Sequence, residues 1–395
     1  MKKTLLTICL VWMCFSLSAQ KIIDLSGKWS FSIDRQDNGE KEKWFSHTLN
    51  DFINLPGSMP EKLKGDEVTA KTQWTGSLYD SSYYYNPYME KYRKEGNIKF
   101  PFFLTPDKHY VGAAWYQKEV NIPADWKGER ILLFLERPHI ETTVWVNGQK
   151  TGMQNSLCVP HQYDITRYVR PGKCTITIRV DNRIKEINVG PDSHSITDQT
   201  QGNWNGIVGR ICLQTTPKTY FDDIQIYPEP EQKLARVKVV IKGAGITKIK
   251  LSAESFNTDK KHIVPAIQQE IKLNKGVTET EMVLPMGNDM LLWDEFHPAL
   301  YKLKAEVTNG KKTEIKEIQF GMRRFEIKGK WFYVNGRKTQ LRGTVENCDF
   351  PLTGYAPMDV ESWERVFRIC RSYGLNHMRF HSFCPPEAAF MAADR

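Results

Sequence analysis

The sequence predicts a mainly β chain with three successive parts: a jelly-roll β-sandwich, an immunoglobulin-like β-sandwich and the first two β/α units of a TIM barrel. Apolar side chains alternate with a period of two along most of the chain, and the pattern changes to strand, helix, strand, helix near its end. A length of 395 residues suits two or three domains. We expect a signal peptide at 1–20, the jelly roll at 21–220, the second sandwich at 221–320 and the barrel start at 321–395.

The first twenty residues have the pattern of a secretory signal peptide. Lys2 and Lys3 precede an apolar run from Leu5 to Leu17, and small residues follow. This run is too short to be a membrane-spanning helix on which the fold depends. We therefore expect export to the periplasm or the extracellular space and no membrane span.

Charge and cysteine usage narrow the possible partners. The formal net charge is +9, but the basic residues are scattered, whereas proteins that bind nucleic-acid backbones concentrate them on one face. We expect no nucleic-acid partner. The cysteines beyond the signal peptide lack the spacing of metal ligands, so we expect no metal or cofactor, and buried thiols with at most one disulfide bond: Cys158, Cys174, Cys212, Cys348, Cys370 and Cys384.

Alternation is clearest in the first sandwich. Trp29, Phe31 and Ile33 share one face of a predicted strand. Another strand is predicted at 175–180, where isoleucines and a valine alternate with polar residues. Asn147-Gly148 predicts a tight hairpin turn, because both residue types tolerate positive φ.

An aromatic insertion interrupts this sandwich at 79–103. Its rings could form a stacking surface for sugars, or they could fasten a long loop to the sandwich, which is the interpretation we favour. They are Tyr79, Tyr83, Tyr84, Tyr85, Tyr88, Tyr92, Phe100, Phe102 and Phe103.

The second sandwich is predicted from strands at 234–243, 248–256, 280–285 and 300–310. It offers no catalytic-looking cluster of titratable groups. We interpret it as a spacer.

The barrel start begins with a predicted strand from Thr339. Asp359 caps a helix that Gly374 ends, and Pro385 and Pro386 lead into a second helix. Two units cannot close a barrel, so we expect exposed strand edges and an exposed apolar face around Met378 and Phe380. Barrel chemistry lies on loops after the strands, where the chain has Glu346, Asn347, Asp349, Arg379 and His381.

This order of parts, together with five motifs, resembles glycoside hydrolase family 2, which contains β-galactosidases, β-glucuronidases and β-mannosidases. The motifs are WYQKEVNIPADWKGERILLFLERPHIETTVWVNGQ, HQYDIT, NWNGIVGRICL, LLWDEFHPALYKL and FGMRRFEIKGKWFYVNGRKTQLRGTVEN. They are spread over the whole chain after the signal peptide.

The resemblance implies a retaining, exo-acting β-glycosidase with two catalytic glutamates whose carboxyl groups lie about 5 to 5.5 Å apart. In the family both glutamates lie on later barrel strands, so we expect no catalytic residue here and no activity of this chain alone. We expect the gene to continue beyond Arg395, or the product to be truncated. Glu346 and Asp349 are assigned to contacts with substrate hydroxyls.

Departures from the family pattern leave the sugar open. Asn347 and Cys348 stand where many members have histidine and glutamate, and His381 starts a triplet that differs from the family's serine, histidine and tyrosine. Arg379 either orients a carboxylate or holds the charge of the nucleophile, or it forms a salt bridge in the barrel mouth. A uronic acid and an unusual plant-polysaccharide sugar both stay open as the substrate. His381 either contacts a sugar hydroxyl or is a satisfied loop histidine.

Asn203, Trp204 and Asn205 correspond to a family loop that reaches the active site from the sandwich. The alternative, which we slightly favour, is a sheet-edge turn held by asparagine bonds.

Two other functions stay open. A non-catalytic carbohydrate-binding protein explains both sandwiches, whereas a structural cell-surface array leaves the loop from Arg342 to Gly354 unexplained. The expected partner is an oligosaccharide or glycoside, and a homo-oligomer is possible.

Overall fold

The computed structural model describes residues 20–395 except 70, 76–84, 98–104, 186–192 and 199. The chain forms two compact units, of which one holds 217–292 and 299–323, and the other holds 21–216, 293–298 and 324–395. The prediction of a mainly β chain is confirmed. The predicted signal peptide, apart from Gln20, lies outside the described residues, as do six of the nine rings of the aromatic insertion: Tyr79, Tyr83, Tyr84, Phe100, Phe102 and Phe103. Of the described rings, Tyr85 and Tyr88 are exposed.

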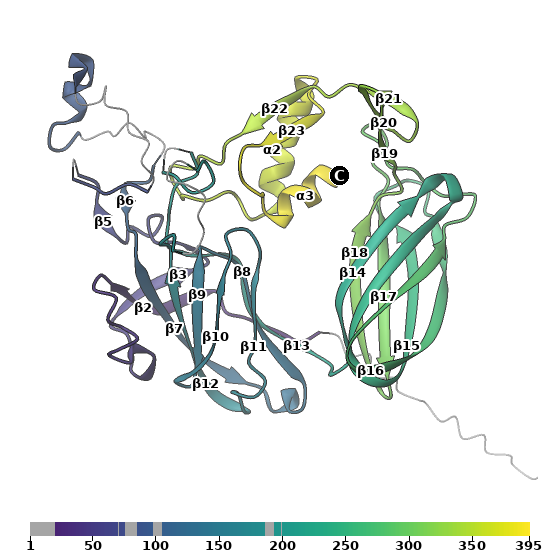
Figure 1. Cartoon of the computed structure of the whole chain (residues 1–395), viewed down its shortest axis with the longest axis horizontal. Helices are drawn as coiled ribbons and strands as arrows, with labels where there is room; N and C mark the ends of the chain where they lie inside the picture. The colour runs from purple at the N-terminus through teal and green to yellow at the C-terminus, as the bar shows by residue number, and fades with distance from the viewer. Residues whose placement is uncertain (1–19, 70, 76–84, 98–104, 186–192, 199) are drawn as a thin grey trace, which may run out of the picture. The chain divides into compact units, whose positions relative to one another are not determined.

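Two antiparallel sheets form the first sandwich (Figure 1). One sheet has the order β1 (Ile22–Asp24), β13 (Gly206–Thr216), β8 (Arg130–Pro138) and β11 (His161–Asp164), with β4 (Gly57–Ser58) beside β13. The other has the order β10 (Gln149–Asn155), β9 (Glu141–Val146), β12 (Gly172–Asp181), β7 (Ala113–Ile122), β2 (Gly27–Asp34) and β3 (Asp51–Leu55). A short pair, β5 (Asp66–Glu67) and β6 (Lys108–His109), stands apart from both.

Alternation along the strands builds the core between these sheets. Ile176, Ile178 and Val180 on β12 are fully buried, as are Trp29 and Phe31 on β2. Asn147 and Gly148, with φ of 50° and 77°, form the predicted turn between β9 and β10. Local patterning therefore determines both the buried face and the hairpin register.

The second unit is organised around one long strand. β15 (Leu234–Ser255) pairs with β14 (Tyr220–Glu229) along its first half, with β17 (Tyr301–Asn309) along its second, and with β16 (Ile263–Pro285) along most of its length. β18 (Lys312–Phe320) completes the sheet beside β17. The prediction of separate strands at 234–243 and 248–256 is wrong, because a register shift between Gly243 and Gly245 bends one continuous strand.

The last part contains a small antiparallel sheet and then a parallel pair. β19 (Phe325–Lys328), β20 (Trp331–Val334) and β21 (Arg337–Thr339) form the sheet, and Asn335-Gly336 makes the predicted turn. β22 (Gly343–Glu346) and β23 (His377–Phe380) run parallel. The first parallel strand thus begins at Gly343 rather than Thr339, because Thr339 pairs with β20.

Helix α2 (Val360–Ser372) follows β22, and α3 (Glu387–Asp394) follows β23. Asp359 caps α2 by accepting the Ser362 N–H at 2.8 Å. At the other end the N–H groups of Gly374 and Leu375 donate to the carbonyls of Arg371 and Cys370, and Gly374 has φ 77°. Both predicted helix ends are confirmed. The closed barrel remains a prediction.

The apolar face of the parallel pair is covered. Phe380 packs edge-on against Trp363 of α2 with ring centroids 5.6 Å apart, and Met378 joins the same cluster. Val345 and Arg379, on the opposite face, are exposed. The expectation of an exposed apolar face around Met378 and Phe380 is wrong, because α2 and α3 partly bury both side chains.

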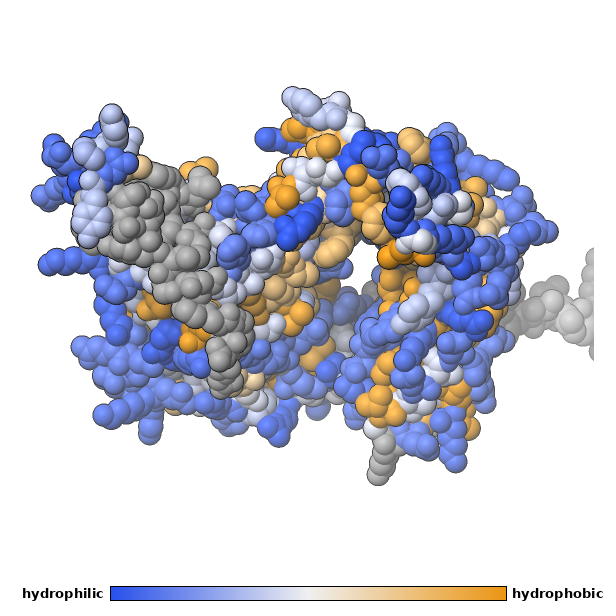
Figure 2. All heavy atoms as spheres, turned by 45° about the horizontal axis from the view of Figure 1, so that its top comes forward, coloured by the Kyte–Doolittle hydropathy of each residue, from blue (hydrophilic) through white to orange (hydrophobic). Residues whose placement is uncertain are grey.

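Figure 2 shows one face of the surface, on which hydrophilic side chains predominate and hydrophobic ones form separate groups. Within the described ranges, no helix is long and apolar enough to cross a bilayer.

Candidate functional site

Two loops meet at the carboxyl ends of the parallel strands. Glu346, the last residue of β22, is paired with Phe380, the last residue of β23. The next residue, His381, donates its N–H to the Glu346 carbonyl at 2.8 Å and extends the ladder by one bond. The loops that contain Asn347 and His381 therefore start side by side, as expected for parallel strands.

The loop after β22 carries two carboxyl groups close together. Oε1 of Glu346 accepts the Cys348 N–H at 2.8 Å, and Cys348 has φ 65°. Burial raises the pKa of Asp349 to about 6, and the charge of Glu346 adds to this shift. Near neutral pH, Asp349 can thus accept hydrogen bonds as a carboxylate or donate one as an acid.

Arg379 lies one residue before the end of β23, beside Val345. Its exposed side chain starts from the face of the strand pair opposite α2, whereas Phe380 points toward α2. Arg379 is therefore on a different face of the strand pair from the α2 contacts.

His381 combines a buried nitrogen with a ring contact from the sandwich. Nδ1 is buried and has no hydrogen-bond partner within the described part of the chain. The ring meets His194 edge to face, with centroids 5.0 Å apart. A buried imidazole nitrogen without a partner is suited to a polar ligand group.

A loop of the sandwich holds both strand-end loops. Nε2 of Gln201 donates to the Asn347 carbonyl at 3.1 Å and to the His381 carbonyl at 2.6 Å. The sequence analysis missed Gln201 and His194. Every residue has a backbone carbonyl, so the sequence does not show which carbonyls Gln201 binds. The one available signal was position, since Gln201 lies two residues before Asn203.

Trp204 reaches the loop after β22, but it is only 5% exposed. Its ring stacks on His139 with centroids 4.4 Å apart and tilts against Tyr355 at 5.6 Å. The Tyr355 hydroxyl donates to Oε2 of Glu61 at 3.0 Å, and burial raises its pKa. Trp204 thus forms packing contacts between sandwich and loop, and Tyr355 is another residue that the sequence analysis missed.

Asn203 and Asn205 use their amides inside the sandwich. Asn205 accepts from the Tyr116 hydroxyl at 2.7 Å and donates to the carbonyls of Gly112 and Val180. Asn203 donates to the Thr75 hydroxyl and the Asn182 carbonyl, and accepts from the Asn182 amide. These bonds favour the structural alternative for both residues.

Arg137 on β8 binds the loop after β23. Nη1 donates to the Cys384 carbonyl at 3.0 Å, and Nη2 donates to the carbonyls of Pro385 and Cys158, each at 3.2 Å. Arg210 on β13 also pairs with Glu387, the first residue of α3, at 2.8 Å. Arg137 and Arg210 therefore fix the C-terminal end of this loop, and Gln201 binds its first residue, His381.

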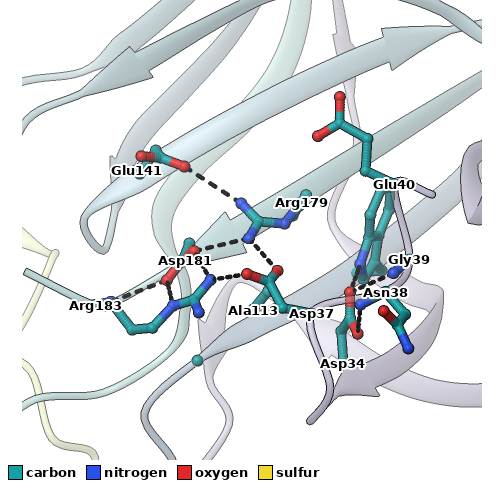
Figure 3. A network of polar contacts seen from close by, with 12 residues as sticks. Asp34, Asp37, Asn38, Gly39, Glu40, Ala113, Glu141, Arg179, Asp181 and Arg183 are labelled. Atoms are coloured by element: carbon teal, nitrogen blue, oxygen red, sulfur yellow. Dashed lines mark hydrogen bonds and ion pairs between the residues drawn. The ribbon is translucent and has the colours of Figure 1, made fainter. Parts of the chain in front are cut away.

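A second group of charged side chains lies on the face of β12 opposite the core residues Ile178 and Val180 (Figure 3). Arg179 bonds to Asp37, Glu141 and Asp181, and Arg183 bonds to Asp37 and Asp181. Burial alone would raise the pKa of Asp181, but bonds from Arg183 and Lys185 outweigh burial and hold it well below the usual range. Because each carboxylate is matched by a cation, we interpret this group as structural.

The described residues contain no cluster of three or more His, Cys, Asp or Glu side chains that could hold a metal ion. Six cysteines are free thiols: Cys158, Cys174, Cys212, Cys348, Cys370 and Cys384.

Two family models match the chain. The model of the glycosyl hydrolases family 2 sugar binding domain matches residues 22–217, and that of glycosyl hydrolases family 2 matches residues 219–323. A β-glucuronidase of Homo sapiens is 23% identical, over 94% of this chain and 55% of that protein. A β-galactosidase of Thermoanaerobacter pseudethanolicus is 24% identical, over 75% of this chain and 39% of that protein.

Solved structures agree on the fold. A glycosyl hydrolase family 2 member from Bacteroides cellulosilyticus has a TM-score of 0.68 at 19% identity, over 95% of this chain and 46% of that one. A Bacteroides uniformis β-glucuronidase has a TM-score of 0.68 at 16% identity, over 95% of this chain and 41% of that one. The chain thus spans about half or less of each of these proteins.

Proposed function

Because the chain belongs to glycosyl hydrolase family 2, we propose that it supplies the sugar-binding sandwich and the first substrate-contacting loops of an exported, retaining, exo-acting β-glycosidase. The observation that supports this most directly is the pair of bonds from Gln201 to Asn347 and His381, because they join the sandwich to both strand-end loops. Loops after the strands are where β/α barrels bind substrate.

In this proposal the loop after β22 contacts sugar hydroxyls. Asp349, with a pKa of about 6, accepts hydroxyl hydrogen bonds at neutral pH, and Glu346 offers its remaining oxygen. Nδ1 of His381 takes a further hydroxyl. Calorimetry with methyl β-glycosides tests this assignment, and Asp349→Asn is expected to weaken binding on the order of tenfold.

We propose a terminal β-linked uronic acid as the sugar. Support comes from the β-glucuronidase relatives and from the exposed cation Arg379 near the strand ends, because a guanidinium binds a carboxylate in a bidentate manner. The chain should bind methyl β-D-glucuronide more tightly than methyl β-D-galactoside, and Arg379→Gln should remove the difference. Equal affinity for both sugars in the unchanged chain would count against a uronic acid.

The catalytic acid and nucleophile are proposed to lie outside residues 1–395. Glu346 and Asp349 belong to one loop, and Glu346 is already bonded to that loop's own backbone. The purified chain should therefore leave 4-nitrophenyl β-glycosides intact. Turnover that Glu346→Gln abolishes would show instead that this loop carries out the chemistry.

Export is proposed from residues 1–20. Fractionation of cells that produce the chain with and without this segment tests it, and retention of both forms inside the cell would contradict it.

A non-catalytic carbohydrate-binding protein is the second candidate, favoured by the match of residues 22–217 to a sugar binding domain. It expects residues 21–320 alone to bind oligosaccharides. The β-glycosidase proposal expects binding to require the loops after β22 and β23.

A further inference from the structure

Gln201 connects three segments that are far apart in the chain. Its amide nitrogen has two hydrogens, and it donates to the carbonyls of Asn347 and His381, which are 146 and 180 residues away. The side chain is buried, at 8% exposure. One amide therefore satisfies one carbonyl in each strand-end loop.

The backbone around Gln201 is itself fixed to the sandwich. Its N–H donates to the Thr197 carbonyl at 3.1 Å. Asp198 accepts the Asn203 N–H at 2.8 Å with one oxygen and the Thr75 N–H at 2.6 Å with the other. The amide of Gln201 thus projects from a well-anchored turn.

The two acceptors lie where the parallel ladder ends. Its last bond joins the His381 N–H to the Glu346 carbonyl. The carbonyls of Asn347 and His381 accept from Gln201 instead. Each is followed by a non-glycine residue with positive φ, Cys348 at 65° and Ser382 at 60°. Such conformations are disfavoured and persist where surrounding contacts hold them.

We propose that Gln201 is a positioning residue, which sets the spacing of the two strand-end loops and so the geometry in which Glu346, Asp349 and His381 meet the sugar. This inference rests on the proposed function, because it assumes that these loops bind the sugar. Gln201 acts through the backbone carbonyls and touches no substrate. Its loss should therefore change sugar affinity and loop order more than overall stability.

The test compares Gln201→Met with Gln154→Met in the whole chain. Methionine keeps the length of glutamine but donates no hydrogen bond. Gln154 is a matched control, because its Nε2 also bonds a backbone carbonyl, that of Gln162 at 2.5 Å, between the edge strands β10 and β11 of the two sheets of the sandwich. Hydrogen exchange of peptides covering 347–354 and 381–386 and calorimetry with methyl β-D-glucuronide and methyl β-D-galactoside are the readouts.

For Gln201→Met we expect faster exchange in both peptides and affinity reduced on the order of tenfold, with the melting temperature within a few degrees of the control. Gln201→Asn keeps the amide on a side chain that is shorter by one carbon. Its exchange rates and affinity should lie between those of the unchanged chain and those of Gln201→Met. If a folded Gln201→Asn or Gln201→Met chain keeps the original exchange rates and affinity, the proposal is wrong.

The exchange measurement also separates this proposal from the proposed function. If the unchanged chain binds neither sugar, the proposed function fails, and faster exchange in Gln201→Met would still support the loop-spacing role. If the chain binds sugar and Gln201→Met neither weakens binding nor loosens the loops, only the positioning role fails.

Discussion

Arg179 and Asp181 lie two residues apart on β12, and their side chains bond to each other at 2.8 Å on the face of this strand opposite the core of the first sandwich. Because alternate residues of a strand point to the same face, this spacing lets the two charges meet. Asp181 is fully buried and Arg179 is 7% exposed, so each depends on the other for compensation.

Asp181→Asn should lower the free energy of unfolding by roughly 3 to 5 kcal/mol, because it removes a fully buried carboxylate that the buried Arg179 shares with the partly exposed Arg183 and Lys185. Urea denaturation at pH 7 measures the change. Glu254→Gln is the control, since Glu254 pairs with Lys261 at the surface and its loss should change little. A loss of under 1 kcal/mol for Asp181→Asn would show that the buried pair contributes no more than a surface pair does.

His161 should make stability depend on pH. Burial lowers its pKa from 6.5 to about 4, so the folded chain favours the neutral ring. The stability it contributes is fully present above pH 6.5 and is lost as the pH falls from 6.5 to 4, at about 1.4 kcal/mol per pH unit. The urea concentration at the unfolding midpoint, measured at pH 7.5, 6.0 and 5.0, should fall less steeply with decreasing pH for His161→Gln than for the unchanged chain. The unchanged chain gives the reference slope.

Asp349 should titrate near pH 6, and Glu346→Gln should lower its pKa toward the ordinary range by removing the neighbouring charge. Because the pKa of Asp349 is higher in the folded chain than in the unfolded chain, its ionised form lowers the free energy of unfolding above pH 6. This destabilisation disappears as the pH falls below 6 and the folded chain binds the proton. Carboxyl ¹³C shifts followed by NMR give the pKa directly. Titration near pH 4 in the unchanged chain would show that Asp349 is better solvated than its burial indicates.

Asn205→Ala should lower the free energy of unfolding by about 3 kcal/mol, because it removes three hydrogen bonds and leaves the Tyr116 hydroxyl and two carbonyls buried. Sugar affinity of the folded variant should stay the same. Thermal unfolding and calorimetry together make the comparison. Loss of sugar affinity without loss of stability would indicate that Asn205 contacts the substrate.

Gly374→Ala should lower the free energy of unfolding by about 1 kcal/mol, because of backbone strain and not because of a steric clash. Gly374 has φ 77°, and an added Cβ would meet no atom within 4 Å. Gly152 is the control, since it lies in β10, where an added Cβ would make ordinary contact with Tyr163 at 3.7 Å. Gly152→Ala should therefore be neutral or slightly stabilising in the same denaturation experiment.

Features set by neighbouring residues were predictable from the sequence. The turns at Asn147-Gly148 and Asn335-Gly336 and the ends of α2 depend on a few adjacent residues, and all are found where expected. The sequence predicts a break between strands near Gly243 and Gly245, where the structure has a register shift within one strand, because glycine marks a bulge and a strand end alike.

Contacts between residues far apart in the chain were harder to predict from the sequence. Gln201 and Tyr355 act through partners more than a hundred residues away, and nothing in their local sequence marks them. The covering of Met378 and Phe380 was missed for a similar reason, since it depends on how α2 and α3 pack together. The position of Asn347, Asp349 and His381 beside the strand ends could be predicted, because parallel strands bring their carboxyl ends to one edge, whereas their contact with substrate stays a prediction.

The bonds from Arg137 and Gln201 to the last part of the chain span 146 to 248 residues, and they imply an order of assembly during synthesis. The sandwich leaves the ribosome first and can fold while the later residues are still being added. The donor groups of Arg137 and Gln201 are then in place before their acceptors, and the strand-end loops can bind to them as they emerge. A slow-folding sandwich would therefore delay the shaping of these loops, even though every residue in them is unchanged.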